Sequence, residues 1–388
     1  MVENPLRQIQ TYGQSVWLDY IQRRLLTSGE LKRLIETDGL QGVTSNPAIF
    51  DQAISGSQDY DTAIRPLALR GKSGEEIYLS LAVSDIQHAA DLLRPVYDRL
   101  AGQDGFVSLE VNPHLAHDTS GTIAEARRLW AAVDRPNVLI KVPGTLAGLP
   151  TITQLISDGI NINVTLLFGL PRYQQVAEAY LAGLEARASQ GLPLDRVASV
   201  ASFFLSRIDV LLDPRLEKIA AGGGPLAQAA AALKGQVAIA SAKAAYGIYQ
   251  RIFAGERFRT LAAKGARPQR VLWASTSTKN PAYSDVKYVE PLIGPQTINT
   301  MPLETINAYR DHGNPASRLE EDQAEAVSLL QRLPELGLDL NEATQQLEDE
   351  GVEKFIKPYD SLMRSLEEKR TSALQEPAGE RHRRGPTC

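Results

Sequence analysis

Short apolar runs alternate with longer amphipathic stretches along most of the chain. The short runs predict strands and the long stretches predict helices. Eight strands are expected, at Ser15–Tyr20, Gly42–Pro47, Phe106–Asn112, Asn137–Pro143, Gly159–Phe168, Val197–Phe204, Arg270–Thr276 and within Tyr288–Pro302. Strands that alternate with helices form parallel sheets, and eight such units close into a (β/α)8 TIM barrel. An open doubly wound sheet is the alternative, but no glycine-rich nucleotide-binding motif follows any predicted strand.

Helices are expected between these strands, together with additional helices outside the repeat. The clearest are Ser28–Thr37, Thr122–Val133, Thr145–Leu155, Pro171–Gln190, Pro225–Arg251 and Leu340–Arg370, and several must lie within Gln52–Leu100. We therefore expect a single barrel domain over residues 1–375. Residues 376–388 contain proline, glycine and clustered arginine, which predicts a disordered tail.

Polar residues recur on one face of the predicted strands, near their carboxyl ends. Counting every second position groups Trp17 with Asp19, Thr44 with Asn46, Ser108 with Glu110 and Asn112, Leu139 with Lys141, Asn161 with Asn163 and Thr165, and Ser202 with Phe204. Branched apolar side chains normally fill a barrel, and burying an unpaired polar group costs about 1–3 kcal/mol. Each residue alone would more often be a satisfied core residue. Together, at the end where barrel active sites form, they predict catalysis.

Lys141 stands near the end of an apolar strand, where its amine would be cut off from water. Burial disfavours the ammonium form and so favours the neutral, nucleophilic amine that a Schiff base requires. The alternative is a lysine that reaches the surface or pairs with a carboxylate. Asp19 and Glu110 could transfer protons. This set of residues suits carbonyl chemistry through an imine, including carbon–carbon bond cleavage.

Two cations follow predicted strands and indicate a phosphate site. Arg207 comes after Ser202-Phe-Phe-Leu, and Lys279 comes after Ser275-Thr-Ser-Thr. A guanidinium group beside a cluster of hydroxyls can hold a phosphate. A surface salt bridge is the alternative for either residue.

The composition, with 43% hydrophobic and 22% charged residues, is that of a globular protein. A formal net charge of -5 without a basic stripe argues against nucleic acid as a partner. No apolar stretch is long enough to span a bilayer, so no membrane partner is expected. The beginning of the chain lacks a signal-peptide pattern, which predicts a cytoplasmic protein.

Cysteine and histidine give little support for a metal site. Cys388 is the only cysteine, so no internal disulfide or cysteine metal site is expected. His114 and His117 have metal-ligand spacing, but no acidic residue at a convincing distance in sequence completes the set. We expect neither a metal nor a cofactor. The sequence leaves a monomer and a homodimer equally open.

Several motifs, in order from about residue 12 to 370, resemble the transaldolase family. They are Gly42-Val-Thr-Ser-Asn-Pro-Ala-Ile-Phe50, Val107-Ser-Leu-Glu-Val111, Leu139-Ile-Lys-Val-Pro-Gly-Thr145, Asn161-Ile-Asn-Val-Thr-Leu-Leu-Phe168 and Ala201-Ser-Phe-Phe-Leu-Ser-Arg207. Trp273-Ala-Ser-Thr and Asp311-His-Gly313 resemble the longer bacterial form of the family.

The resemblance implies a class I aldolase of the pentose phosphate pathway. Lys141 matches the lysine that attacks the C2 ketone of sedoheptulose 7-phosphate or fructose 6-phosphate. Asp19 matches the acid that takes the C4 hydroxyl proton, and Glu110 and Thr165 match the pair that holds the water of imine formation. The dihydroxyacetone unit would pass to glyceraldehyde 3-phosphate or erythrose 4-phosphate.

The resemblance also implies a set of substrate contacts. Those expected at the three-carbon unit and its surroundings are Thr44, Asn46, Asn163, Ser202 and Phe204, and those expected at phosphate are Arg207 and Ser275. Many family members carry an arginine shortly after the serine of the seventh strand. Here the basic residue is Lys279, which holds phosphate as a point charge without a bidentate fork.

Three alternatives remain. A fructose 6-phosphate aldolase would carry Gln in place of Glu110 and Tyr in place of Phe204, whereas this chain has the transferase residue at both positions. A non-catalytic sugar-phosphate-binding protein would not need a desolvated amine. The chain could also be one half of a longer transaldolase–isomerase polypeptide, although the polar tail gives no sign of a second domain.

Overall fold

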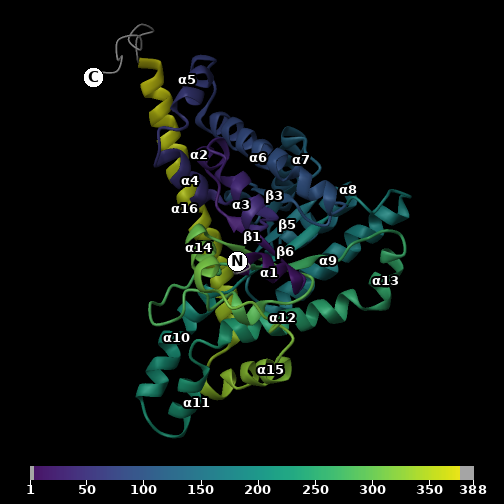
Figure 1. Ribbon diagram of the computed structural model, residues 1–388, viewed down its shortest axis with the longest axis vertical. Coiled ribbons are helices and arrows are strands. Elements are labelled where there is room, and N and C mark those ends of the chain that lie inside the picture. Colours follow the sequence, from purple (N-terminus) through teal and green to yellow (C-terminus); the bar gives the residue numbers. More distant parts are fainter. Residues whose placement is uncertain (1–3, 376–388) are drawn as a thin grey trace.

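Parallel strands close into a barrel in chain order in the computed structural model, which describes residues 4–375 (Figure 1). The strands are β1 (Gln14–Asp19), β2 (Gly42–Thr44), β3 (Phe106–Glu110), β4 (Val138–Pro143), β5 (Ile162–Leu167), β6 (Ser199–Phe204), β7 (Arg270–Ala274) and β8 (Thr297–Met301). The predicted (β/α)8 barrel is confirmed, and each strand lies where a strand was expected. The tail predicted at 376–388 lies outside the described residues.

Helices separate the strands and extend beyond them. Those up to β5 are α1 (Pro5–Thr11), α2 (Arg23–Thr27), α3 (Glu30–Asp38), α4 (Pro47–Ser55), α5 (Asp61–Leu69), α6 (Gly74–Arg99), η1 (Pro113–Leu115), α7 (Thr119–Val133) and α8 (Gly148–Asp158). Those after β5 are α9 (Leu170–Ser189), α10 (Ser206–Ala221), α11 (Pro225–Leu233), α12 (Val237–Phe253), α13 (Glu256–Ala262), η2 (Glu290–Leu292), α14 (Leu303–His312), α15 (Gln323–Gln331), η3 (Leu333–Leu336) and α16 (Leu340–Gln375). The labels η1 to η3 denote 3-10 helices.

The alanine-rich stretch Pro225–Arg251 was expected to be one helix, and that prediction is wrong. It forms two helices, α11 and α12, with a break around Gly235. Gly235 adopts a φ of 68°, which glycine tolerates far better than residues with a Cβ. Its N–H donates to Asp213 Oδ1 at 2.7 Å, so the turn is held by a bond to α10.

Some predicted strands extend too far because residues at their ends act as helix caps. Gly159, the expected first residue of one strand, is the C-cap of α8 with a φ of 83°. Asn46, expected next to the last residue of the second strand, and Asn112, expected at the end of the third, accept backbone N–H groups at the starts of α4 and η1. Asparagine is well suited to such caps because its side-chain oxygen satisfies an otherwise unpaired donor.

The strand register places polar side chains side by side inside the barrel. Glu110 pairs with Lys141 across β3 and β4, and Lys141 pairs with Asn163 across β4 and β5. Ile140 and Val142, on either side of Lys141 along β4, point to the opposite face, where α7 and α8 cover β4. The alternation expected from the sequence is therefore present in these central strands.

The last helix, α16, crosses the carboxyl end of the barrel. It contacts α4, η1 and α10, which follow three different strands, and it contacts β5 itself. Figure 1 shows α16 in yellow, running from the carboxyl end of the chain past α4 towards α10. Gly351 allows the close approach, because a Cβ there would lie 3.0 Å from Leu166 Cδ2. The sequence predicted this helix but not its position.

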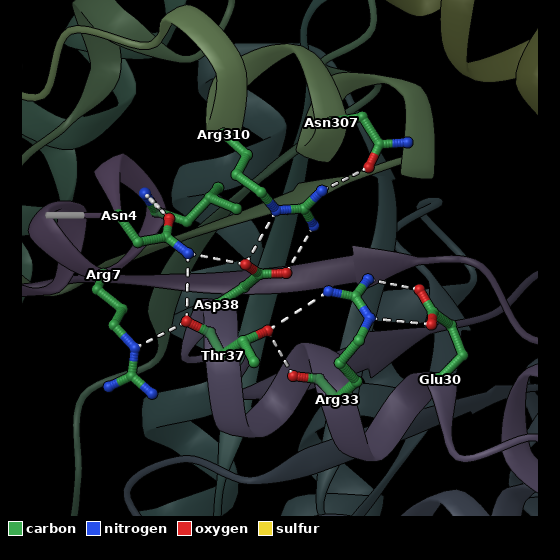
Figure 2. A network of polar contacts seen from close by, with 9 residues as sticks. Asn4, Arg7, Glu30, Arg33, Thr37, Asp38, Asn307 and Arg310 are labelled. Carbon is green, nitrogen blue, oxygen red and sulfur yellow. Dashed lines mark hydrogen bonds and ion pairs between the residues drawn. The ribbon is translucent and has the colours of Figure 1, made fainter. Parts of the chain in front are cut away.

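A buried carboxylate joins three helices near the closure of the barrel (Figure 2). Asp38, at the end of α3, accepts two bonds from Arg310 of α14, at 2.9 and 2.6 Å. The Asn4 amide, which precedes α1, donates to Asp38 Oδ1 at 2.8 Å. Since β1 and β8 pair directly, this contact fixes the helices that flank the first and last strands.

Candidate active site

A cavity of about 430 Å3 opens at the carboxyl end of the barrel and collects most of the predicted site residues. Those lining it are Asp19, Thr44, Asn46, Lys141, Ser202, Phe204, Arg207, Ser275 and Lys279. A larger cavity of about 840 Å3 lies at the opposite end, beside Ser15, Phe106 and Arg270 near the starts of their strands. None of the predicted site residues lines it, so size alone does not identify the site.

Lys141 projects into the inner face of β4 and is 4% exposed. Its Nζ donates to the carbonyl oxygen of Ser45 at 3.2 Å and lies 3.2 Å from Glu110 Oε2. The ring of Phe355, from α16, lies 5.5 Å from the same nitrogen. Burial and carboxylate pairing were alternatives from the sequence, and both occur together here.

Glu110 is the last residue of β3 and is 9% exposed. Burial raises the pKa of its carboxyl to about 7, and the neighbouring Lys141 opposes this rise. A carboxyl group with such a pKa exchanges a proton readily near neutral pH, as a general acid–base group must. A carboxyl group of this character therefore lies 3.2 Å from the Lys141 amine.

Asp19 ends β1 on the other side of the cavity. The Thr44 hydroxyl donates to Asp19 Oδ1 at 2.6 Å and lies 2.8 Å from the Thr300 hydroxyl of β8. Burial raises the pKa of Asp19 above its ordinary value, although the charge of Lys141 and the bond from Thr44 act in the opposite direction. Burial thus makes Asp19 a stronger base than it would be in water.

Asn163 and Ser202 form a bonded row across the barrel interior. Ser202 Oγ donates to Asn163 Oδ1 at 2.7 Å, and Asn163 Nδ2 donates to Ser108 Oγ at 3.1 Å. Ser202 lines the cavity, whereas Asn163 is not among the residues that line it. The row holds the two side chains in fixed orientations beside Lys141.

Thr165 and Glu110 each present a buried oxygen to the interior. Within residues 4–375, Thr165 Oγ1 has no hydrogen-bond partner, whereas Glu110 Oε2 has the Lys141 amine 3.2 Å away. Neither residue lines the 430 Å3 cavity. Buried polar atoms are normally satisfied, and an ordered water is a common partner for such groups. Thr165 Oγ1 therefore has the character of a group that binds an ordered water.

Arg207 lies in the first turn of α10 and lines the same cavity as Asp19. Its guanidinium carbon is 5.5 Å from the ring centre of Phe204 and 6.0 Å from that of Phe355. Burial lowers its pKa. Among the described residues it forms no ion pair, and its Nη1 has no hydrogen-bond partner. A half-buried cation with an unpaired donor and no carboxylate partner is typical of an anion site.

The segment after β7 completes this side of the cavity. Ser275 has a φ of 55°, and its hydroxyl lies 2.8 Å from that of Ser206. Lys279 is exposed, and its amine donates to the Ser277 hydroxyl. The structure therefore brings Arg207, Ser275 and Lys279 to one cavity.

Three contributions to the site were missed in the sequence. Thr300 orients Thr44, Ser45 acts through its backbone carbonyl, and Phe355 covers the amine from α16. Ser45 lies inside a motif that was noticed, so its position could have been included. Nothing local marks Phe355, which is separated from Lys141 by most of the chain.

His114, one of the two histidines with metal-ligand spacing, lies 2.7 Å from Asp360. His114 and His117 are both exposed. Over residues 4–375, no group of three or more histidine, cysteine or acidic side chains has the arrangement of a metal site. In the same range, no helix has the length and apolar character needed to cross a membrane.

Comparison with known proteins assigns the chain to a family. Residues 16–366 match the family model described as transaldolase/fructose-6-phosphate aldolase. The chain is 49% identical over 375 residues to a transaldolase of Trichodesmium erythraeum, covering 95% of this chain and 98% of that protein. It is 46% identical over 364 residues to a transaldolase of Saccharopolyspora erythraea, covering 94% and 97%. The chain therefore belongs to the transaldolase/fructose-6-phosphate aldolase family.

Proposed function

We propose that the chain is a transaldolase, which moves a dihydroxyacetone unit from sedoheptulose 7-phosphate or fructose 6-phosphate to glyceraldehyde 3-phosphate or erythrose 4-phosphate. The observation that carries the proposal is the buried amine of Lys141, 3.2 Å from Glu110 and at the wall of a cavity that also contains Asp19. An amine in this position can capture a ketose covalently.

Imine formation begins with a proton transfer. Glu110 accepts a proton from Lys141, and the neutral amine attacks the C2 carbonyl of the ketose. The resulting carbinolamine loses its hydroxyl as water, and the proton for that departure returns from Glu110. A water held between Glu110 Oε2 and Thr165 Oγ1 would relay these protons, because Thr165 Oγ1 is buried without a partner and Glu110 Oε2 lies beside the Lys141 amine.

Cleavage of the C3–C4 bond requires a base at the C4 hydroxyl. Asp19 takes that proton, the C4 oxygen becomes an aldehyde, and the bonding electrons pass into the imine to give an enamine on Lys141. The aldose phosphate leaves, and an acceptor aldehyde reverses these steps. The raised pKa of Asp19 supports its role as the base.

The remaining polar residues would hold the substrate along the cavity. Thr44 fixes Asp19, while Asn46 and Ser202 line the wall near Lys141 and would bind the hydroxyls of the three-carbon unit. Asn163 would act there too, held by its bond with Ser202.

The phosphate would lie at the other end of the cavity. Arg207, Ser275 and Lys279 supply donors there, and Phe204 packs beside the guanidinium. We also propose a cytoplasmic location, which agrees with a chain whose only cysteine is Cys388.

The competing function is fructose 6-phosphate aldolase activity, which releases free dihydroxyacetone. The test incubates the enzyme with fructose 6-phosphate, with and without erythrose 4-phosphate, and measures sedoheptulose 7-phosphate and dihydroxyacetone. A transaldolase forms the heptose only with the acceptor and little free dihydroxyacetone without it. Rapid release of dihydroxyacetone without an acceptor, with no heptose formed when one is present, would show an aldolase instead.

A further inference from the structure

The segment between β7 and β8 has two parts, which contact different regions of the protein. Its first part carries Ser275, Ser277 and Lys279, which line the cavity. Its second part carries Tyr283 and Tyr288, whose hydroxyls point to α10. The segment thus spans the space between the substrate cavity and a helix that itself begins at the cavity.

Asp209 of α10 receives the deeper of these contacts and is 1% exposed. The Tyr288 hydroxyl donates to Asp209 Oδ2 at 2.9 Å. The other oxygen, Oδ1, accepts the N–H of Ala238 at the start of α12, also at 2.9 Å. Lys287 Nζ lies 3.9 Å from Oδ2. One buried carboxylate therefore joins α10, α12 and the β7–β8 segment.

Asp213 repeats this arrangement one turn later on the same helix. The Tyr283 hydroxyl donates to Asp213 Oδ2 at 2.7 Å, and the Gly235 N–H donates to Oδ1 at 2.7 Å. Lys287 closes the cluster, because its amine donates to the Gly235 carbonyl and lies 3.7 Å from the centre of the Tyr283 ring. Two carboxylates, spaced one helical turn apart, thus form hydrogen bonds with the segment at two points.

The same helix presents Arg207 to the cavity, two residues before Asp209. At its start, the Ser206 N–H donates to the Ser275 carbonyl at 3.1 Å. Helix α10 is a stiff element. The bonds between its carboxylates and the β7–β8 segment therefore also determine the distance between Arg207 and Lys279. Lys279 itself is exposed and, apart from its bond to Ser277, is placed only by the course of the segment.

We propose that Asp209 and Asp213, acting through Tyr288 and Tyr283, are positioning residues for the end of the cavity that binds the substrate phosphate. The inference rests on the proposed assignment of Arg207 and Lys279 to the phosphate. The cluster sets the distance between a guanidinium on α10 and an ammonium on the β7–β8 segment. Two charges at a fixed backbone separation bind a phosphate more tightly than a mobile pair, because the ordering cost on binding is smaller.

The test compares two acceptors at saturating fructose 6-phosphate, glyceraldehyde 3-phosphate and unphosphorylated glyceraldehyde. Tyr288→Phe should raise KM for the phosphorylated acceptor about tenfold, a change in affinity equivalent to the loss of roughly one hydrogen bond. KM for glyceraldehyde should change less than about twofold, as should kcat with either acceptor. Lys287→Met removes the cation of the cluster but keeps an apolar stem, and it should produce the same split if Tyr288→Phe folds poorly.

Tyr180→Phe is the matched control, because the Tyr180 hydroxyl also donates one bond, to the Arg267 carbonyl at 2.7 Å, outside both the cavity and the cluster. It should lower the melting temperature without changing the ratio of the two KM values. Equal KM changes for both acceptors in Tyr288→Phe and Lys287→Met would overturn the inference.

Arg207→Gln separates this failure from failure of the phosphate assignment. If Arg207→Gln raises KM for the phosphorylated acceptor alone while the cluster variants do not, the phosphate site stands and the positioning role is wrong. If Arg207→Gln affects both acceptors equally, the phosphate assignment is wrong and the positioning role falls with it.

Discussion

Replacing Glu110 by glutamine should change how stability depends on pH. Glu110 is buried, and burial raises its pKa from an ordinary value of 4.5 to about 7. Over this interval the folded protein keeps a proton that the unfolded chain has already lost. The free energy of unfolding therefore falls as pH rises from 4.5 to about 7, and the Glu110 contribution is constant outside that window. The amide of Glu110→Gln does not titrate, so this fall is absent.

The size of the effect follows from the pKa difference. Each pKa unit corresponds to about 1.4 kcal/mol, so the rise to about 7 represents roughly 3 kcal/mol. Between pH 5 and pH 8 most of this window is crossed. The wild-type protein should lose roughly 2–3 kcal/mol more than Glu110→Gln over that range.

The assay is urea unfolding followed by circular dichroism at pH 5 and pH 8. Glu36→Gln serves as the control, because the Glu36 side chain is 63% exposed and lies on α3, away from the cavity. The control should follow the wild-type pH dependence. If Glu110→Gln also follows it, Glu110 ionises as it would in water, and the argument that burial prepares it for proton exchange is wrong.

Three further predictions concern the base, the cover of the site and the Asp38 cluster. Asp19→Asn should still form the imine but cleave about 10²–10⁴ times more slowly, so mass spectrometry should detect an accumulated covalent adduct on Lys141; its absence would contradict the assigned role. Phe355→Ala should lower the free energy of unfolding by about 3–5 kcal/mol in urea, and an unchanged value would show that α16 does not pack as described. Arg310→Leu leaves the Asp38 carboxylate buried without a counter-charge, with only the Asn4 amide bonded to it, which should cost about 3–5 kcal/mol. Combining it with Asp38→Asn should recover part of that loss, and a purely additive double variant would contradict the coupling.

The barrel was predictable because its signals are local. Each strand is a short apolar run between turns, and the polar positions recur with period two, so Glu110, Lys141 and Asn163 could be assigned to one face before their register was known. Because all strands of such a barrel run in the same direction, their carboxyl ends could be placed together. Most of the predicted site residues consequently line one cavity.

Other features were not predictable because they depend on tertiary packing. Composition alone favoured one helix through Gly235, whereas a bond to Asp213 holds a turn there. Helix α16 was recognised from its pattern, yet nothing in that pattern states which surface it covers, so the place of Phe355 beside Lys141 could not be inferred. The pairing of Lys141 with Glu110 also needed side-chain geometry, because strand register fixes neighbours but not the reach of long side chains.

The most direct test of the catalytic account is chemical trapping. The enzyme is incubated with fructose 6-phosphate and borohydride, digested, and mapped by peptide mass spectrometry. The account predicts a reduced dihydroxyacetone adduct on the peptide that contains Lys141, and none in Lys141→Met. An adduct on a different lysine, or an active enzyme that forms none, would contradict it.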